Sequence, residues 1–285
     1  MSGIQNHITI NFPMKSPADG KAIKEELPPL MPDFAKVQDA IGSVHYSRFL
    51  PWQDKTLLFL ADIDGDVEKF YGELAKSAGS VFDTIFKHVV NPPPTPVVDN
   101  SDTFIQWVKH NSSHPLIAYA AYEKSSVQDV KSSARAAGFT GSTEQRPLLL
   151  PLHLKSSLGA FTLEHIVIEA TQGKMIKGAD SVGTLHFAHF VALPNNHLGF
   201  FTVYDGTFEK YMQDFTQKIG PIFDVLYTFV TDHPPLPVAK NAQAFTDYVA
   251  ATEYSPIGFY SAYPGLSVQD VKALLADAKV GAASS

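Results

Sequence analysis

Cysteine is absent from the 285 residues, and positive charge is sparse, with 22 Lys and Arg against 29 Asp and Glu. Without cysteine the chain has no disulfides, no thiolate nucleophile and no cysteine metal ligands. The formal net charge is -7 and no lysine- or arginine-rich run offsets it, which opposes nonspecific nucleic-acid binding because that binding needs a cationic surface. Nucleic acid is therefore not an expected partner.

Long hydrophobic runs are also missing. No apolar stretch approaches the roughly 18 residues of a membrane span, and the N-terminus from Met1 to His7 lacks the basic and apolar regions of a secretory signal. We therefore expect a cytoplasmic protein with no membrane partner. The sequence has no Gly-rich phosphate loop, nucleophile elbow or HExxH motif, and its 11 histidines show no metal-binding spacing.

Two stretches of the sequence are copies of one another. Residues 42–131 realign on residues 183–272 without a gap and with about a third of positions identical, and a long period in only two copies argues against a solenoid. The repeat predicts two fused homologous domains related by a pseudo-twofold axis. We place the first over residues 1–138 and the second over residues 139–285.

Hydrophobic periodicity predicts the elements of each copy. Strands are expected over 7–14, 44–50, 57–63 and 116–122, and helices over 18–27, 33–41, 66–86 and 102–110. The hairpin loop is expected over 51–54. The second copy is expected to open with a strand over 148–154, one residue out of the main register, and a helix over 161–175. The order β-α-β-β-α-β is typical of the ferredoxin-like split βαβ unit.

A ferredoxin-like sheet carries helices on one face only, so its other face must find a partner. The sister domain can supply that partner. We predict an α+β fold in which tandem ferredoxin-like βαββαβ repeats pack sheet to sheet as an α+β barrel within one chain. This architecture is also compatible with a homodimer.

Histidine recurs at matched positions of the second predicted strand. His45 and Arg48 of the first copy correspond to His186 and His189 of the second. By strand alternation, Arg48 faces away from His45 unless a bulge re-aims one of them. The histidines are either hydrogen-bonded packing residues or ligand and acid/base groups, because a buried imidazole needs a partner in both cases.

A carboxylate ends the third predicted strand in both copies. Asp64 and Asp205 are each followed by glycine, directly before the long helix. One interpretation is that each aspartate caps the backbone amides of that helix. The other is a carboxylate at the mouth of the barrel, shuttling protons beside His45 or His186.

The motif G-[ST]-x-H-[FY]-x-[RH]-F, followed by Asp-Gly and an aromatic helix, resembles the dimeric α+β barrel superfamily. That superfamily includes dye-decolorising peroxidases, chlorite dismutases and small cofactor-independent monooxygenases. Fused double copies are typical of the first two families, which bind heme between the sheet and helices of one half. The resemblance therefore implies heme as a candidate cofactor.

The peroxidases use a G-x-x-D-G loop with a distal Asp and Arg, and a proximal His on a later helix. The loops ending at Asp64 and Asp205 both lack the first glycine, and the only histidine after Gly206 is His233, in a Pro-rich loop. In the first half, His88 and His110 are the candidate heme ligands that the resemblance leaves.

The resemblance and the repeated residues together predict a protein that binds a small apolar or aromatic molecule, with oxidoreductase activity of the peroxidase or monooxygenase type. In a catalytic site, His45 or His186 would be the base or ligand, Asp64 or Asp205 the proton relay, and Arg48 the electrostatic partner of an anion or oxidant. The alternative is a noncatalytic binding or assembly protein whose histidines satisfy buried polar contacts.

Overall fold

The computed structural model describes residues 4–156, 169–252 and 254–283. The chain divides into two compact units, each built from segments of both halves of the sequence. The first unit contains Met1–His114, Lys124–Lys131 and Tyr254–Tyr263, and the second contains Pro115–Glu123, Ser132–Glu253 and Pro264–Ser285. None of the described helices is long and apolar enough to cross a membrane.

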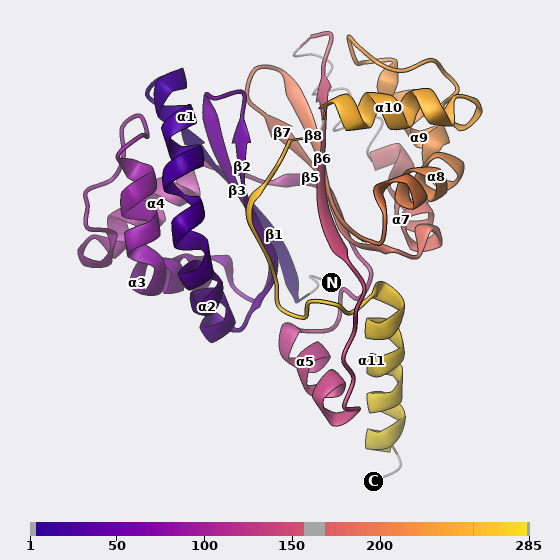
Figure 1. Ribbon diagram of the computed structural model, residues 1–285, viewed down its shortest axis with the longest axis horizontal. Coiled ribbons are helices and arrows are strands. Elements are labelled where there is room, and N and C mark those ends of the chain that lie inside the picture. Colours follow the sequence, from indigo (N-terminus) through magenta and orange to yellow (C-terminus); the bar gives the residue numbers. More distant parts are fainter. Residues whose placement is uncertain (1–3, 157–168, 253, 284–285) are drawn as a thin grey trace. The chain divides into compact units, whose positions relative to one another are not determined.

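The first unit is built on an antiparallel sheet of strand order β4-β1-β3-β2-β9. Its strands are β1 (Gln5–Pro13), β2 (Val44–Trp52), β3 (Thr56–Asp64), β4 (Ser112–Ser113) and β9 (Ile257–Ser261). Its helices α1 (Pro17–Glu26), α2 (Met31–Ile41), α3 (Val67–Phe86) and α4 (Ser101–His110) lie on one face of this sheet (Figure 1). The predicted elements of the first copy are thus present, with ends shifted by up to two residues.

The hairpin between β2 and β3 turns more tightly than the sequence predicts. The loop consists of Gln53, Asp54 and Lys55; Gln53 and Asp54 both have φ of 52°, and positive φ at two consecutive turn positions matches the right-handed twist of the flanking strands. Pro51 and Trp52, which we expected in the loop, therefore belong to β2 and pair with β3.

An aromatic core fills the space between the first sheet and its helices. Phe34 of α2 lies 5.6 Å from Phe49 and 5.9 Å from Phe59, measured between ring centroids, and 6.4 Å from Phe82 of α3. Ser47 also faces α2, because its hydroxyl donates to the side chain of Gln38. Strand alternation then places Tyr46 and Arg48 on the opposite, helix-free face of the sheet.

The second unit is built on an antiparallel sheet of strand order β5-β7-β8-β6. Its strands are β5 (Pro115–Ala120), β6 (Gln145–His153), β7 (Leu185–Leu193) and β8 (His197–Asp205). Its helices include α7 (Glu169–Val182), α8 (Phe208–Lys218), α9 (Gly220–Tyr227), α10 (Ala242–Thr252) and α11 (Val268–Ala283). Helix α5 (Val127–Ala136) begins in the first unit and ends in the second. Residues 161–168 of the helix predicted over 161–175 lie outside the described residues.

The one-residue change of register predicted for the second copy agrees with the strand pairing. Gln5 of β1 lies opposite Asp64, and Gln145 of β6 lies opposite Asp205. The fold is therefore a mixed α+β arrangement with two antiparallel sheets, compatible with an α+β barrel.

The last strand of each copy joins the sheet formed by the other copy. The strand predicted over 116–122 forms as β5, but it pairs with β7 instead of completing the first sheet. Strand β9 in turn pairs with β2, placing Tyr46 opposite Ser261. Our expectation that 116–122 would complete the first unit is wrong, because alternation predicts a strand but carries no information about its partner. The division of the chain into a first repeat over residues 1–138 and a second over residues 139–285 stays a prediction.

Candidate functional site

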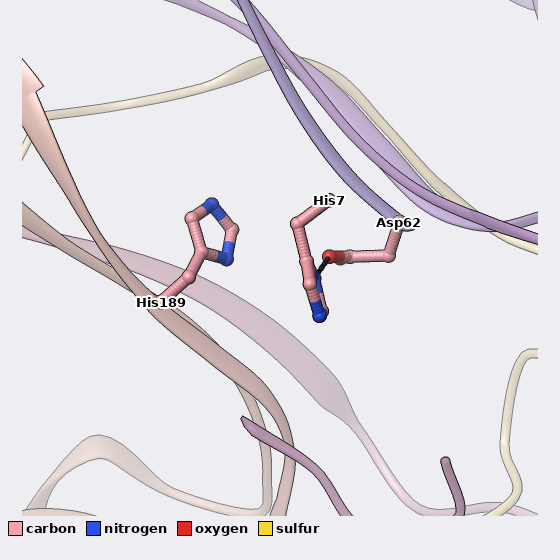
Figure 2. Close-up of side chains that lie close together, drawn as sticks. All are labelled: His7, Asp62 and His189. Atoms are coloured by element: carbon pink, nitrogen blue, oxygen red, sulfur yellow. Dashed lines mark hydrogen bonds and ion pairs between the residues drawn. The ribbon is translucent and has the colours of Figure 1, made fainter. Parts of the chain in front are cut away.

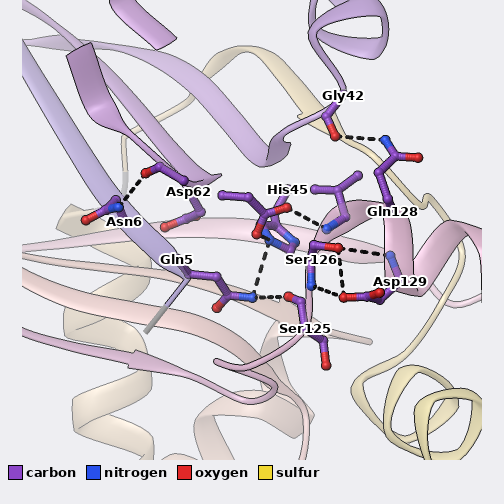
Figure 3. Close-up of polar contacts among 12 residues, drawn as sticks. Gln5, Asn6, Gly42, His45, Asp62, Ser125, Ser126, Gln128 and Asp129 are labelled. Carbon is purple, nitrogen blue, oxygen red and sulfur yellow. Dashed lines mark hydrogen bonds and ion pairs between the residues drawn. The ribbon is translucent and has the colours of Figure 1, made fainter. Parts of the chain in front are cut away.

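His45 lies at the centre of a hydrogen-bond network in the first unit. Its side chain is fully buried at a β-bulge in β2. Nδ1 lies 2.7 Å from the hydroxyl of Tyr263, and Nε2 lies 2.8 Å from Oδ1 of Asp64 (Figure 3). Gln5 approaches Nε2 at 3.3 Å and also donates to the carbonyl of Ser125 at 2.7 Å. Both ring nitrogens of His45 are therefore engaged.

The second unit contains the same network at matching positions. His186 is fully buried, with Nδ1 2.8 Å from the hydroxyl of Tyr122 and Nε2 2.7 Å from Oδ1 of Asp205. Gln145 donates to the carbonyl of Leu266 at 2.6 Å. The tyrosine of each network follows the exchanged strand, so each network ties that strand to the sheet it joins.

Asp64 and Asp205 cap helices, but not the helices we expected. Oδ2 of Asp64 accepts the backbone N–H of Val127 at 2.6 Å, and Oδ2 of Asp205 accepts that of Val268 at 2.7 Å. Each carboxylate thus satisfies a free amide in the first turn of α5 or α11.

The helices that directly follow these aspartates in the sequence have other caps. Asp66 accepts from the amide of Lys69 at 2.7 Å at the start of α3, and Thr207 accepts from Lys210 at 3.3 Å at the start of α8. The expectation that Asp64 and Asp205 cap the long helix is therefore corrected.

The two networks have the geometry of structural contacts. A carboxylate only accepts, so the imidazole Nε2–H donates to aspartate, and Nδ1 lies within hydrogen-bond distance of the tyrosine hydroxyl. The second aspartate oxygen is already engaged by a backbone amide. Neither His45 nor His186 lines the apolar pocket of the second unit described below. The acid/base and proton-relay roles of His45, His186, Asp64 and Asp205 stay predictions, and the contacts favour the alternative in which these groups satisfy one another.

Arg48 lies apart from the His45 network, on the helix-free face of the first sheet. Its side chain is 2% exposed. Burial lowers the pKa of Arg48 to about 10, and the charge of Asp62 opposes this shift. Asp62 accepts from Nδ1 of His7 at 2.6 Å (Figure 2). Sequence reasoning did not single out His7 or Asp62; the signal was present, since two polar residues stand in otherwise apolar strands.

His189, the counterpart of Arg48, is buried in the second unit. Its ring stacks on Phe201 with 5.4 Å between centroids. Its neighbours along β7, Ala188 and Phe190, face the helices: Phe190 lies 6.1 Å from Phe223 of α9. By alternation, the His189 ring lies on the opposite face.

An apolar pocket lies between the second sheet and its helices. It contains about 410 Å³ of space without atoms, part of which is open to solvent, and it is lined by residues of β5, β7, β8, α7 and α9. The buried lining residues include Met175, Ala179, Ala188, Phe190 and Phe200. Apart from His189, whose ring faces the other side of β7, the polar lining residue is Tyr119, and its hydroxyl donates to Asp180 at 2.8 Å. Sequence reasoning missed this pocket.

The histidines considered as heme ligands do not suit that role. An axial ligand needs a free imidazole nitrogen beside a cavity. His88 has Nδ1 3.0 Å from Asp19 and Nε2 3.3 Å from Glu26. His110, at the end of α4, and His233 are both exposed. These three histidines therefore do not fit the role of a heme ligand.

No protein-family model matches the chain, and no curated protein matches it. Among solved structures, a "putative monooxygenase" from Lactobacillus acidophilus NCFM has a TM-score of 0.36 and 7% identity, covering 93% of this chain and 99% of that one. A "putative monooxygenase" from Fusobacterium nucleatum subsp. nucleatum has a TM-score of 0.35 and 10% identity, covering 94% and 98%. An "anthrone oxidase-like protein" has a TM-score of 0.34 and 10% identity, covering 92% and 95%.

These three structures are described as monooxygenases or as oxidase-like, and not as peroxidases or chlorite dismutases. The resemblance to dye-decolorising peroxidases and chlorite dismutases therefore stays a prediction. At such low TM-scores and identities, the function has to be argued from the site itself.

Proposed function

We propose that this protein binds a small apolar molecule in the pocket of the second unit. The observation that carries the proposal is a set of replacements between the two units. Realigned from Gly42 and Gly183 back along α2 and α7, Phe34 corresponds to Met175, and Gln38 corresponds to Ala179. The pocket thus lies where the first unit has larger side chains.

In the first unit, larger side chains occupy the matching space. The ring of Phe34 packs among Phe49, Phe59 and Phe82, and Gln38 accepts from Ser47 beside it. In the second unit, Met175 replaces the ring, and Ala179 and Ala188 replace the hydrogen-bonded pair of Gln38 and Ser47. The replacements of Phe34 by Met175, Gln38 by Ala179 and Ser47 by Ala188 each make the side chain smaller or less polar at the site of the pocket.

The alignment of α2 with α7 is supported by contacts outside the pocket. Tyr260 donates to Asp39 at 2.8 Å in the first unit, and Tyr119 donates to Asp180 at 2.8 Å in the second. The helices also end alike, since Gly42 has φ of 72° and Gly183 has φ of 78°. The difference in packing is therefore a difference in side chains at matched positions.

The lining indicates the chemical class of the ligand. Pockets for small molecules are mostly apolar with a few polar groups, and the lining of this pocket is apolar apart from Tyr119 and His189. Since the hydroxyl of Tyr119 is engaged by Asp180, the pocket favours a ligand whose buried part is hydrocarbon. Binding is what this lining supports; peroxidase or monooxygenase activity stays a prediction.

Binding of a neutral fluorescent probe, N-phenyl-1-naphthylamine, tests the proposal. We expect saturable binding at one site, abolished by Met175→Phe because this ring restores the packing of Phe34. Ala179→Gln, which restores the side chain of the first unit, is a second variant that should weaken binding. Val280→Phe adds a ring at a position that is 69% exposed in α11 and should bind as the wild type does. Equal binding by Met175→Phe and the wild type would refute the pocket.

We also propose that the chain is a tandem duplication of one ferredoxin-like unit and that its two sheets pair as a barrel. The matched histidine networks, the exchanged strands and the sheets with helices on one face support this. A compact 285-residue chain should have a radius of gyration of about 19 Å. A clearly larger value in small-angle X-ray scattering of the monomer would contradict the barrel.

A further inference from the structure

The hydroxyl of Tyr119 lies where the apolar pocket of the second unit meets an exposed carboxylate. Tyr119 lines the pocket and is buried, and its hydroxyl donates to Oδ1 of Asp180 at 2.8 Å. Asp180 follows the lining residue Ala179 in α7, and the side chain of Asp180 is 55% exposed. This hydrogen bond is therefore at the rim of the pocket, between the apolar lining and solvent.

The direction of this hydrogen bond determines which further contact the hydroxyl can make. A hydroxyl group has one proton to donate and two lone pairs that accept, whereas a carboxylate only accepts. Burial raises the pKa of Tyr119, and the hydrogen bond to Asp180 raises it further, so the phenol keeps its proton and donates it to Asp180. The oxygen of Tyr119 can therefore only accept a further hydrogen bond.

The first unit has the same hydrogen bond beside a larger side chain. Tyr260 donates to Asp39 at 2.8 Å, and Gln38, the residue before Asp39, accepts from Ser47. In the second unit Ala179 stands at the position of Gln38 and lines the pocket. The hydrogen bond between tyrosine and aspartate is thus common to both units, whereas the small side chain that opens the pocket beside it belongs to the second.

We propose that the ligand of this pocket is an apolar molecule with a hydrogen-bond donor at one end, a hydroxyl or N–H group, which donates to the oxygen of Tyr119. This inference rests on the proposed function, because it concerns the same pocket. A ligand that has only an acceptor at this end leaves two acceptors facing each other without a proton, which weakens binding because buried polar groups need partners. The apolar lining binds the body of the ligand, and Tyr119 selects its end group.

Displacement of N-phenyl-1-naphthylamine by two ligands with the same ring system tests this selection. 2-Naphthol carries a donor, and 2-methoxynaphthalene has an oxygen without a proton. Tyr119→Phe should weaken the binding of 2-naphthol about fivefold, as expected for one lost hydrogen bond, and should leave that of 2-methoxynaphthalene within about twofold of the wild type. Tyr260→Phe removes the corresponding hydroxyl from the first unit and should change neither affinity.

Asp180→Ala, at an exposed side chain, is a second variant that does not depend on the folding of Tyr119→Phe. It releases the proton of Tyr119 to donate to an ether oxygen, so 2-methoxynaphthalene should bind about fivefold more tightly than to the wild type. Equal effects of Tyr119→Phe on both ligands, or no gain for 2-methoxynaphthalene in Asp180→Ala, would overturn this inference and leave the pocket in place. Absence of saturable probe binding by the wild type would overturn the pocket and the inference together.

Discussion

The carboxylate of Asp205 reaches the backbone amide of Val268 at 2.7 Å, while its other oxygen lies 2.7 Å from Nε2 of His186. One side chain thus joins the end of β8, the middle of the histidine network and the first turn of α11. The same arrangement holds between Asp64 and Val127 at 2.6 Å.

Asp205→Ala should fray the first turn of α11 and destabilise the second unit. The change removes a helix cap, which contributes about 1 kcal/mol, and leaves His186 without its acceptor, which costs about 1–3 kcal/mol more. Hydrogen exchange at Val268 should accelerate together with a lower urea midpoint. Asp277→Ala, an exposed change later in α11, is the matched control. Unaltered hydrogen exchange at Val268 in Asp205→Ala would show that the hydrogen bond from this amide to Asp205 does not stabilise the start of α11.

His186→Ala should lower stability without affecting occupation of the apolar pocket. It leaves the hydroxyl of Tyr122 and the carboxylate of Asp205 without their ring partner and opens a cavity, together costing about 3 kcal/mol. Urea unfolding measures the loss, and naphthylamine binding under native conditions measures the pocket. His197→Ala, at a half-buried position beside Asn195, should change stability by much less. Lost binding with normal stability would instead favour the ligand role predicted from the sequence.

Gly258→Ala should weaken the attachment of β9 to the first sheet. Gly258 has φ of 65°, and an added Cβ would lie 2.3 Å from the sulfur of Met31 in α2. Backbone strain and this clash together should cost about 2 kcal/mol or more. We expect faster amide exchange in β9 and earlier proteolysis of the C-terminal segment.

A matched pair of variants tests the clash at Gly258. Met31→Ala should partly rescue Gly258→Ala, because it removes the atoms that the new methyl group meets. Absence of rescue would assign the effect to backbone strain alone.

Tyrosine ionisation should destabilise the protein at high pH. Burial raises the pKa of Tyr211, so above the unfolded-state value of about 10 the unfolded chain loses its proton before the folded one. The contribution of Tyr211 to the free energy of unfolding is fully present below pH 10. It is lost as the pH rises, by up to about 1.4 kcal/mol per pH unit.

Tyr211→Phe should therefore show a shallower fall of unfolding free energy between pH 10 and 11 than the wild type. Urea unfolding at several pH values measures the slopes. Tyr254→Phe, at a less buried position, should differ from the wild type by less. Parallel slopes for Tyr211→Phe and the wild type would contradict the effect of burial on this phenol.

The local sequence pattern was enough to predict most helices and strands of this fold. It was not enough to predict which strands pair over long distances in the sequence. The apolar alternation around Phe49 and Phe59 fixes which residues face the helices, because side-chain direction in a strand alternates. The choice of β2 or β7 as the partner of β5 depends on three-dimensional packing that alternation does not record. The predicted loop included Gln53 and Asp54 but began two residues too early, at Pro51, because neither Gln53 nor Asp54 is the glycine that usually marks a turn with positive φ.

In the candidate sites, too, the residues of one segment could be predicted from the sequence, and their partners from distant segments could not. Matched histidines predicted that His45 and His186 share a constraint, and both are buried in equivalent networks. The tyrosine partners, Tyr263 and Tyr122, were not predicted, since each follows a strand that was assigned to the other sheet. The pocket could have been found by comparing Phe34 with Met175, had the realignment been carried back from Gly42 into the preceding helix.

The exchange of β5 and β9 determines when the first sheet can be completed during protein synthesis. A nascent chain that has already made β1, β2 and β3 still lacks the strand that covers the edge of β2, because β9 begins only at Ile257 of 285 residues. An uncovered strand edge pairs readily with other chains. Ribosome-bound or prematurely terminated chains should thus be the species that aggregate, and the last strand to leave the ribosome is the one that closes the first sheet.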